Sequence, residues 1–148
     1  MSIPGEFHAD FANAPTVLAT VSLAGAPPKQ VRFLIDTGAT STTLSPRAAD
    51  RVFPGYADLD WTHDPRLKAV SGVGGICRVI VRLGAIRFID DRLGPLDWDG
   101  LIELIEPTAD SLALPSLLGR DVLDNFRLTV SKRESLISLE VQLPEPVV

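Results

Sequence analysis

The sequence has 148 residues, of which 45% are apolar and 6% aromatic, and its 19 acidic side chains outnumber 14 basic ones to give a formal charge of −5. A chain of this length buries about 68–70% of its unfolded surface, enough for one core but not two, so we expect one domain over residues 1–148, with a core at about 14–141 and flexible tails. The single cysteine, Cys77, excludes an intramolecular disulfide, and no Cys and His residues have zinc-ligand spacing, so we expect no metal and no cofactor.

Charge and hydropathy also exclude two classes of partner. Residues 1–6 lack the basic start and apolar run of a signal peptide, and no stretch approaches the ~18 apolar residues of a membrane span. The net negative charge and an acidic tract over 90–110 argue against nucleic acid, which is bound through basic patches. The sequence therefore predicts a cytoplasmic protein that binds neither membrane nor nucleic acid.

In the first half of the chain, alternating and β-branched runs predict strands at 16–23 and 30–36. Ser45, followed by proline at the first helical position, predicts a short helix that ends before Pro54. Apolar runs on both sides of a glycine-rich centre predict a hairpin over 68–83 with a mobile tip.

The second half of the chain also divides into short elements. Further strands are expected at 85–89, 100–106, 126–131 and 135–141, and a second short helix at 120–125. Many short strands with two brief helices indicate an all-β domain, and we expect a closed barrel.

The tripeptide Asp36-Thr37-Gly38 follows the apolar strand that ends at Ile35. Taken alone it is compatible with a plain turn in which the aspartate bonds its own backbone. Two further segments give it a context. A glycine-tipped hairpin follows about thirty residues later. About eighty residues later comes the segment 117–123, with the sequence Leu-Leu-Gly-Arg-Asp-Val-Leu.

These three blocks, in this order, resemble the retropepsin-like aspartic proteases, the family of retroviral proteases and their single-domain cellular relatives. Residues 34–39 look like the catalytic loop, residues 68–76 look like the flap, and residues 117–121 look like the hydrophobic-Gly-Arg segment that opens the C-terminal helix. The resemblance spans about residues 16–141. It implies a retropepsin-like barrel and an aspartic endopeptidase that cuts extended peptides with apolar side chains flanking the scissile bond.

The chemistry of peptide hydrolysis explains why a single aspartate is not sufficient. One group must take a proton from water while another gives a proton to the carbonyl oxygen or the amine. Two carboxyl groups ~3 Å apart do both, because their mutual repulsion of roughly 5 kcal/mol keeps one proton shared between them. The chain holds one Asp-Thr-Gly and no second copy. The resemblance therefore implies a homodimer in which Asp36 faces Asp36 of the partner copy.

The resemblance also implies a role for each matched residue. Thr37 is expected to bond the partner's loop, and Gly38 to let the backbone approach the substrate. Leu34 points the same way as Asp36 by the period of a strand, whereas Phe33 and Ile35 face the core. The expected substrate-binding residues are Leu34, Ala39, Thr40, Ser71, Gly72, Val73, Gly74, Pro115 and Leu117, and the expected structural supports are Gly119, Arg120 and Asp121.

One departure from the family pattern concerns Arg120. In retroviral members acidic residues follow the catalytic loop and pair with this arginine, but here those positions are Thr40 and Ser41. Asp121 and Asp124 are the candidate replacements, and the sequence does not choose between them.

Other functional interpretations of the sequence have less support. His8 and His63 are the only histidines and fall in loops, which argues against a Ser/His/Asp hydrolase, and Cys77 reads as a small apolar filler. The glycine-rich hairpin is not a phosphate loop, since no Gly-Lys-Ser/Thr follows it. Two alternatives stay open: a catalytically silent module of the same fold that dimerises or binds peptides, and a small barrel that binds an apolar ligand.

Overall fold

The structure is a computed structural model and describes residues 2–23, 25–72 and 75–142. Its strands are β1 (Ser2–Pro4), β2 (Glu6–His8), β3 (Ala14–Leu23), β4 (Lys29–Ile35), β5 (Thr43–Leu44), β6 (Leu67–Gly72), β7 (Gly75–Asp90), β8 (Gly94–Ile105), β9 (Ser116–Leu118), β10 (Phe126–Ser131) and β11 (Leu136–Val141). Its helices are α1 (Pro46–Val52), α2 (Arg120–Leu123) and two 3-10 turns, η1 (Ala9–Phe11) and η2 (Tyr56–Asp58). No helix within these ranges is long and apolar enough to cross a membrane.

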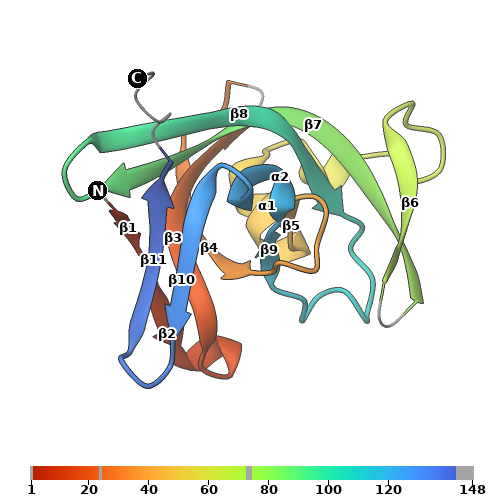
Figure 1. The fold of residues 1–148 in the computed structure, drawn as a ribbon. Helices are drawn as coiled ribbons and strands as arrows, with labels where there is room; N and C mark the ends of the chain where they lie inside the picture. The colour runs from red at the N-terminus through yellow and green to blue at the C-terminus, as the bar shows by residue number, and fades with distance from the viewer. Residues whose placement is uncertain (1, 24, 73–74, 143–148) are drawn as a thin grey trace.

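The larger of two sheets closes into a barrel (Figure 1). Its strand order is β2-β3-β4-β9-β5-β8-β7-β6, and a further pairing of β3 with β7 closes the six strands from β3 to β7 in this order into a ring, with β2 and β6 outside it. The predicted all-β closed barrel is therefore confirmed. Two of its pairings are parallel, β4 with β9 and β5 with β8, and these lie at the centre of the molecule.

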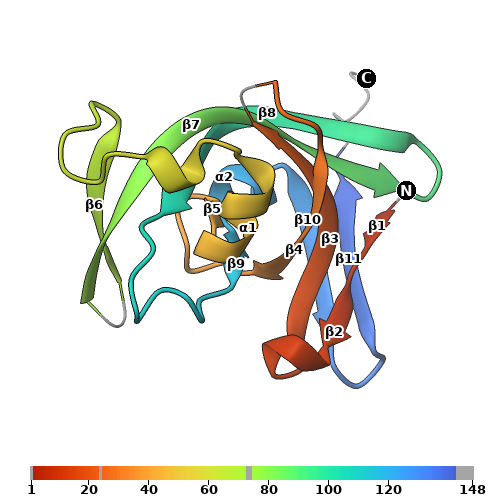
Figure 2. The same ribbon diagram turned by 180° about the vertical axis from the view of Figure 1, so that it is seen from behind.

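The barrel encloses the hydrophobic core because its strands alternate apolar and polar residues. Phe33 and Ile35 of β4 are buried, whereas the alternate residues Arg32 and Leu34 are partly exposed, as the period of a strand predicts. The helix α1 begins at Ser45, whose side chain accepts a hydrogen bond from the Ala48 N–H. Seen from behind, α1 lies against the barrel beside β5 and β9 (Figure 2).

A second, three-stranded sheet has the order β1-β11-β10. Its strand β1 comes from the segment before residue 14, which the sequence led us to treat as a tail. Ser2–Pro4 pairs with Ser138–Glu140, and Ile3 is only 2% exposed. The expectation of a flexible N-terminal tail is wrong for this segment, because three residues are too short for a periodicity signal to show in sequence.

Two predicted strands are parts of longer ones. The strand expected at 85–89 is the end of β7, and the strand expected at 100–106 is the second half of β8, which begins at Gly94. Gly84, which falls between the predicted hairpin and the predicted strand 85–89, lies inside β7 where that strand pairs with β3 and β8 at once. A Cβ at Gly84 would collide with Leu23, so this glycine permits close packing within a continuous strand.

Candidate active site

Asp36 lies at the carboxyl end of β4, in the turn that leaves the barrel. Its backbone N–H donates to the Leu118 carbonyl at 3.1 Å, and its carbonyl accepts from the Ala39 N–H at 3.2 Å. The Asp36 Oδ1 accepts from the Gly38 N–H at 2.9 Å, while Oδ2 has no donor among the described residues. The turn thus fixes the carboxylate through one oxygen and leaves the other available.

The segment that carries β9 and α2 supports this turn from the opposite side. The Arg120 N–H donates to the Ala39 carbonyl at 2.9 Å, and the Asp121 N–H donates to the Thr40 carbonyl at 3.2 Å. Together with the bond from Asp36 to Leu118, these contacts hold residues 36–40 against residues 118–121. Two segments about eighty residues apart in the chain are therefore hydrogen-bonded to each other, and both belong to the blocks that carry the family resemblance.

Thr42 and Gly119 explain how closely the two segments approach. Thr42 is fully buried, and its hydroxyl accepts from the Gly119 N–H at 3.1 Å and donates to the Asp121 Oδ1 at 2.7 Å. A Cβ at Gly119 would lie 2.5 Å from the backbone of Ser41. Glycine is required here because any side chain would collide with the loop.

Arg120 has a different partner from those considered in the sequence. Its Nη2 donates to the Thr40 hydroxyl at 3.2 Å, and within the described ranges neither Asp121 nor Asp124 forms an ion pair with it. The Asp121 carboxylate is instead used by Thr42 and by the backbone N–H of Val122. The structure thus assigns Arg120 to the Thr40 hydroxyl, a partner the sequence left open, and both Asp121 oxygens already have other donors.

Thr37 and Gly38 lie at the surface of the single chain. The Thr37 hydroxyl forms no hydrogen bond within the part of the chain that the structure describes. Asp36 is half-buried, so its carboxylate borders solvent in one copy. The tip of the turn is the part that a second copy could cover.

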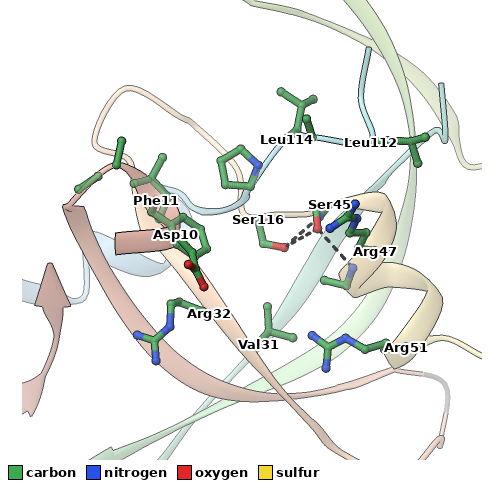
Figure 3. Close-up of a pocket in the computed structure, with 16 residues that line it drawn as sticks. Asp10, Phe11, Val31, Arg32, Ser45, Arg47, Arg51, Leu112, Leu114 and Ser116 are labelled. Atoms are coloured by element: carbon green, nitrogen blue, oxygen red, sulfur yellow. Dashed lines mark hydrogen bonds between the residues drawn. The ribbon is translucent and has the colours of Figure 1, made fainter. Parts of the chain in front are cut away.

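The apolar residues predicted to surround substrate fall into one neighbourhood. Leu34 is paired in register with Leu117 across the parallel strands β4 and β9. Leu34 and Pro115 both line a groove of about 670 Å³ that continues toward α1 (Figure 3). Ala39 and Thr40 follow in the turn itself, and Asp36 does not line the groove.

The predicted flap is the β6–β7 hairpin, in which Ser71 pairs with Ile76 and Gly72 with Gly75. Val73 and Gly74, the other two flap residues expected to hold substrate, lie outside the described residues. At the base of the hairpin, the Lys68 Nζ forms an ion pair with the Glu103 Oε1 at 2.7 Å. The Glu103 N–H donates a hydrogen bond to the Thr42 carbonyl at 3.1 Å. Through Glu103 of β8, the base of the hairpin is thus connected to the segment that follows the catalytic turn.

Sequence reasoning missed several residues around this site. Thr42 lies three residues after the matched loop 34–39, and its burial is visible only once β5 is placed between β8 and β9. Arg32, Arg47 and Arg51 line the groove that contains Leu34. The sequence pattern could have indicated these three arginines. Arg32 lies on the same face of its strand as Leu34, and Arg47 and Arg51 are four residues apart on a predicted helix, so they lie on one side of it.

Around Asp36 the structure places carboxylate, hydroxyl, guanidinium and backbone groups. Within the described ranges, no group of three or more His, Cys, Asp or Glu side chains is placed to hold a metal ion. A carboxyl group such as that of Asp36 can exchange a proton with a substrate or with water.

Comparison with known proteins gives three findings. A family model described as "Aspartyl protease" matches residues 19–122. The chain is similar to the crystal structure of a retropepsin-like aspartic protease from Rickettsia conorii, with 15% identity, 94% of this chain and 98% of that chain covered, and a TM-score of 0.57. No curated protein sequence matches the chain.

Two further solved structures have lower TM-scores. EIAV protease complexed with the inhibitor HBY-793 has 17% identity, with 75% of this chain and 86% of that chain covered and a TM-score of 0.49. The retroviral protease-like domain of Ddi1 from Leishmania major has 15% identity, with 90% and 98% covered and a TM-score of 0.45. The Rickettsia conorii structure establishes the fold, and the predicted retropepsin-like barrel is confirmed.

Proposed function

The chain belongs to the aspartyl protease family, and on that premise we propose that it is an aspartic endopeptidase that works as a homodimer. The observation that carries the proposal is the turn at Asp36, which follows an apolar strand and forms three backbone hydrogen bonds with residues 118–121. A scaffold does not need a carboxylate with a free oxygen at the tip of so well supported a turn.

The reaction requires the carboxyl groups of two chains. One ionised Asp36 takes a proton from water as the water oxygen attacks the peptide carbonyl carbon, and the protonated Asp36 of the other copy donates its proton to the carbonyl oxygen. The tetrahedral intermediate then collapses, the C–N bond breaks, and the amine nitrogen receives a proton from the dyad. With both groups protonated the base is lost, and with both ionised the acid is lost, so activity depends on pH in a bell-shaped manner.

The exposure of Thr37 supports the dimer. An exposed hydroxyl that forms no hydrogen bond with the described residues, beside a half-buried aspartate, is suited to a bond across a two-fold axis that passes between the two turns. Each chain would bring one Asp36 and one Thr37, and the site would be incomplete in a single copy.

The expected substrate is an extended peptide with apolar residues beside the cut. Leu34, Ala39, Pro115 and Leu117 would form the walls, and the backbone of the β6–β7 hairpin would cover the peptide through Ser71, Gly72, Val73 and Gly74. Closure of such a hairpin excludes bulk water from the two carboxyl groups.

A pool of unstructured peptides tests the activity at pH ~4–7, with products identified by mass spectrometry. We expect cleavage that a statine-type mimic inhibits and that Asp36→Asn abolishes. Asp58→Asn is the matched control, since Asp58 is exposed on η2, outside the turn. Binding of peptides without cleavage throughout this range would instead indicate a catalytically silent module.

Mixing experiments test whether the site is shared. When wild-type and Asp36→Asn chains pair at random in equal amounts, about a quarter of the dimers keep both carboxyl groups, so activity per wild-type chain falls to about half. Specific activity should also rise with protein concentration. Full activity of wild-type chains in the mixture, or a monomer by sedimentation that retains activity, would contradict the shared site.

A further inference from the structure

The groove that contains Leu34 is a feature of the described surface that the proposed reaction does not use in full. Its volume of about 670 Å³ falls in the range of ligand sites, and its walls come from η1, β4, α1 and the segment 112–116. Figure 3 shows Arg32 and Arg51 on either side of Val31, with Leu112 and Leu114 across the groove.

The groove is continuous with the proposed cleft. Leu34 of β4 lies two residues before Asp36, which directly follows the strand, a separation of about 6–7 Å along an extended chain. Pro115 precedes β9, whose Leu117 pairs with Leu34. A peptide lying across Leu34 toward the catalytic turn therefore extends, on its other side, into the groove.

The charges of the groove oppose those of the whole chain. Although the net charge is −5, three guanidinium groups line the groove and only one carboxylate, Asp10, accompanies them. The Asp10 side chain is 84% exposed and lies 3.8 Å from the His8 Nδ1, so it does not neutralise an arginine by direct contact.

The three arginines retain donors for a ligand. Arg32 Nη1 lies 2.8 Å from the Glu6 carboxylate and 3.2 Å from the Thr16 hydroxyl. Arg51 uses one nitrogen to donate to the Gln30 carbonyl at 3.2 Å. Arg47 is exposed and has no hydrogen bond or ion pair within the described ranges. Because a guanidinium carries five N–H donors, most of this capacity is unused.

We propose that this groove binds an acidic side chain of the peptide substrate, two or more residues from the scissile bond. The inference deepens the proposed function, since it names the substrate class for the same cleft. Arg47 and Arg51 present forked donors that match a carboxylate, and Leu112 and Leu114, each nearly half exposed, contact the aliphatic part of the peptide. Apolar walls continuous with a peptide cleft favour a peptide over a nucleic acid.

Paired peptides that differ only by Glu or Gln test the inference. We expect kcat/KM to favour Glu by about fivefold at one or more positions outside the two residues that flank the cut, as two partly exposed ion pairs would give. Arg47→Gln/Arg51→Gln should lower this ratio toward one. Arg92→Gln is the matched control, because Arg92 is exposed at the distant turn between β7 and β8, and it should keep the ratio.

Binding to Asp36→Asn protein separates this inference from the catalytic proposal. Fluorescence anisotropy with labelled Glu and Gln peptides should show the same preference, and the preference should shrink as salt is raised. Charge-selective binding that depends on Arg47 and Arg51 supports the groove even if no wild-type cleavage is found. Cleavage with equal Glu/Gln ratios in wild type and the double variant overturns it, as does equal competition by a DNA oligonucleotide of the same length.

Discussion

The Asp121 carboxylate accepts two hydrogen bonds from Thr42, one from the hydroxyl at 2.7 Å and one from the backbone N–H at 3.0 Å. Asp121 belongs to α2 and Thr42 to the end of the catalytic turn, so one side chain links the two segments that meet beneath Asp36. The Thr42 hydroxyl is buried and also accepts from Gly119. Loss of the carboxylate would leave the Thr42 donors unpaired in the interior.

Asp121→Ala should therefore lower the free energy of unfolding by about 2–3 kcal/mol, the cost of removing a charged acceptor from partly buried donors. Asp121→Asn keeps one acceptor oxygen and should lower the free energy of unfolding by a smaller amount. Urea unfolding at neutral pH measures both. Asp124→Ala is the control, since Asp124 is exposed in the same segment and its side chain has no hydrogen bond within the described ranges. Equal losses for Asp121→Ala and Asp124→Ala would show that the link to Thr42 contributes little.

Gly119 gives a second test of the same junction. A Cβ there meets the Ser41 backbone at 2.5 Å, which no side-chain rotation relieves. Gly119→Ala should destabilise the fold by about 3 kcal/mol and displace the catalytic turn. Gly94→Ala serves for comparison, because Gly94 has a φ of 76° but open space around it, and should cost only about 1 kcal/mol. If urea unfolding ranks the two variants in the opposite order, the close approach of Gly119 to Ser41 is not a constraint on the fold.

The sequence was sufficient for the elements whose signals are local. The strand 126–131 and the helix that begins after Ser45 follow from alternation and capping, and both are present. Strands β5 and β9 have two and three residues and exist because neighbouring strands pair with them. No local periodicity marks strands that short, so tertiary pairing decides them.

At the candidate site, the sequence located the residues but not their partners. Asp36 and Gly119 were identified from short motifs, and the structure holds their segments together. The bond between Arg120 and Thr40 was not foreseen, because a motif comparison looks for a carboxylate where this chain has a hydroxyl. The arginine groove depends on the packing of α1 beside β4, which sequence spacing does not specify.

The ion pair between Lys68 and Glu103 should stabilise the fold less than its short N–O distance indicates. The Glu103 side chain is 5% exposed and the Lys68 side chain is 50% exposed. The electrostatic attraction between them is therefore partly offset by the free-energy cost of removing the Glu103 carboxylate from water. Lys68→Met should cost about 1–2 kcal/mol by leaving Glu103 unpaired. Lys68→Met/Glu103→Leu should recover most of that loss. Urea unfolding of the single and double variants measures the coupling, and strictly additive losses would contradict it.

Cys77 should react slowly with alkylating reagents in the folded protein. Burial raises the pKa of its thiol, and the negative charges of Glu103 and Glu106 raise it further, so the reactive thiolate forms only at more alkaline pH than in a free thiol. The rate of iodoacetamide modification should reach half its maximum at higher pH in native protein than in the same protein unfolded in guanidinium. Glu106→Gln removes one negative charge and should shift the native midpoint back toward lower pH. A native midpoint at or below the unfolded one would show that Cys77 does not experience this environment in solution.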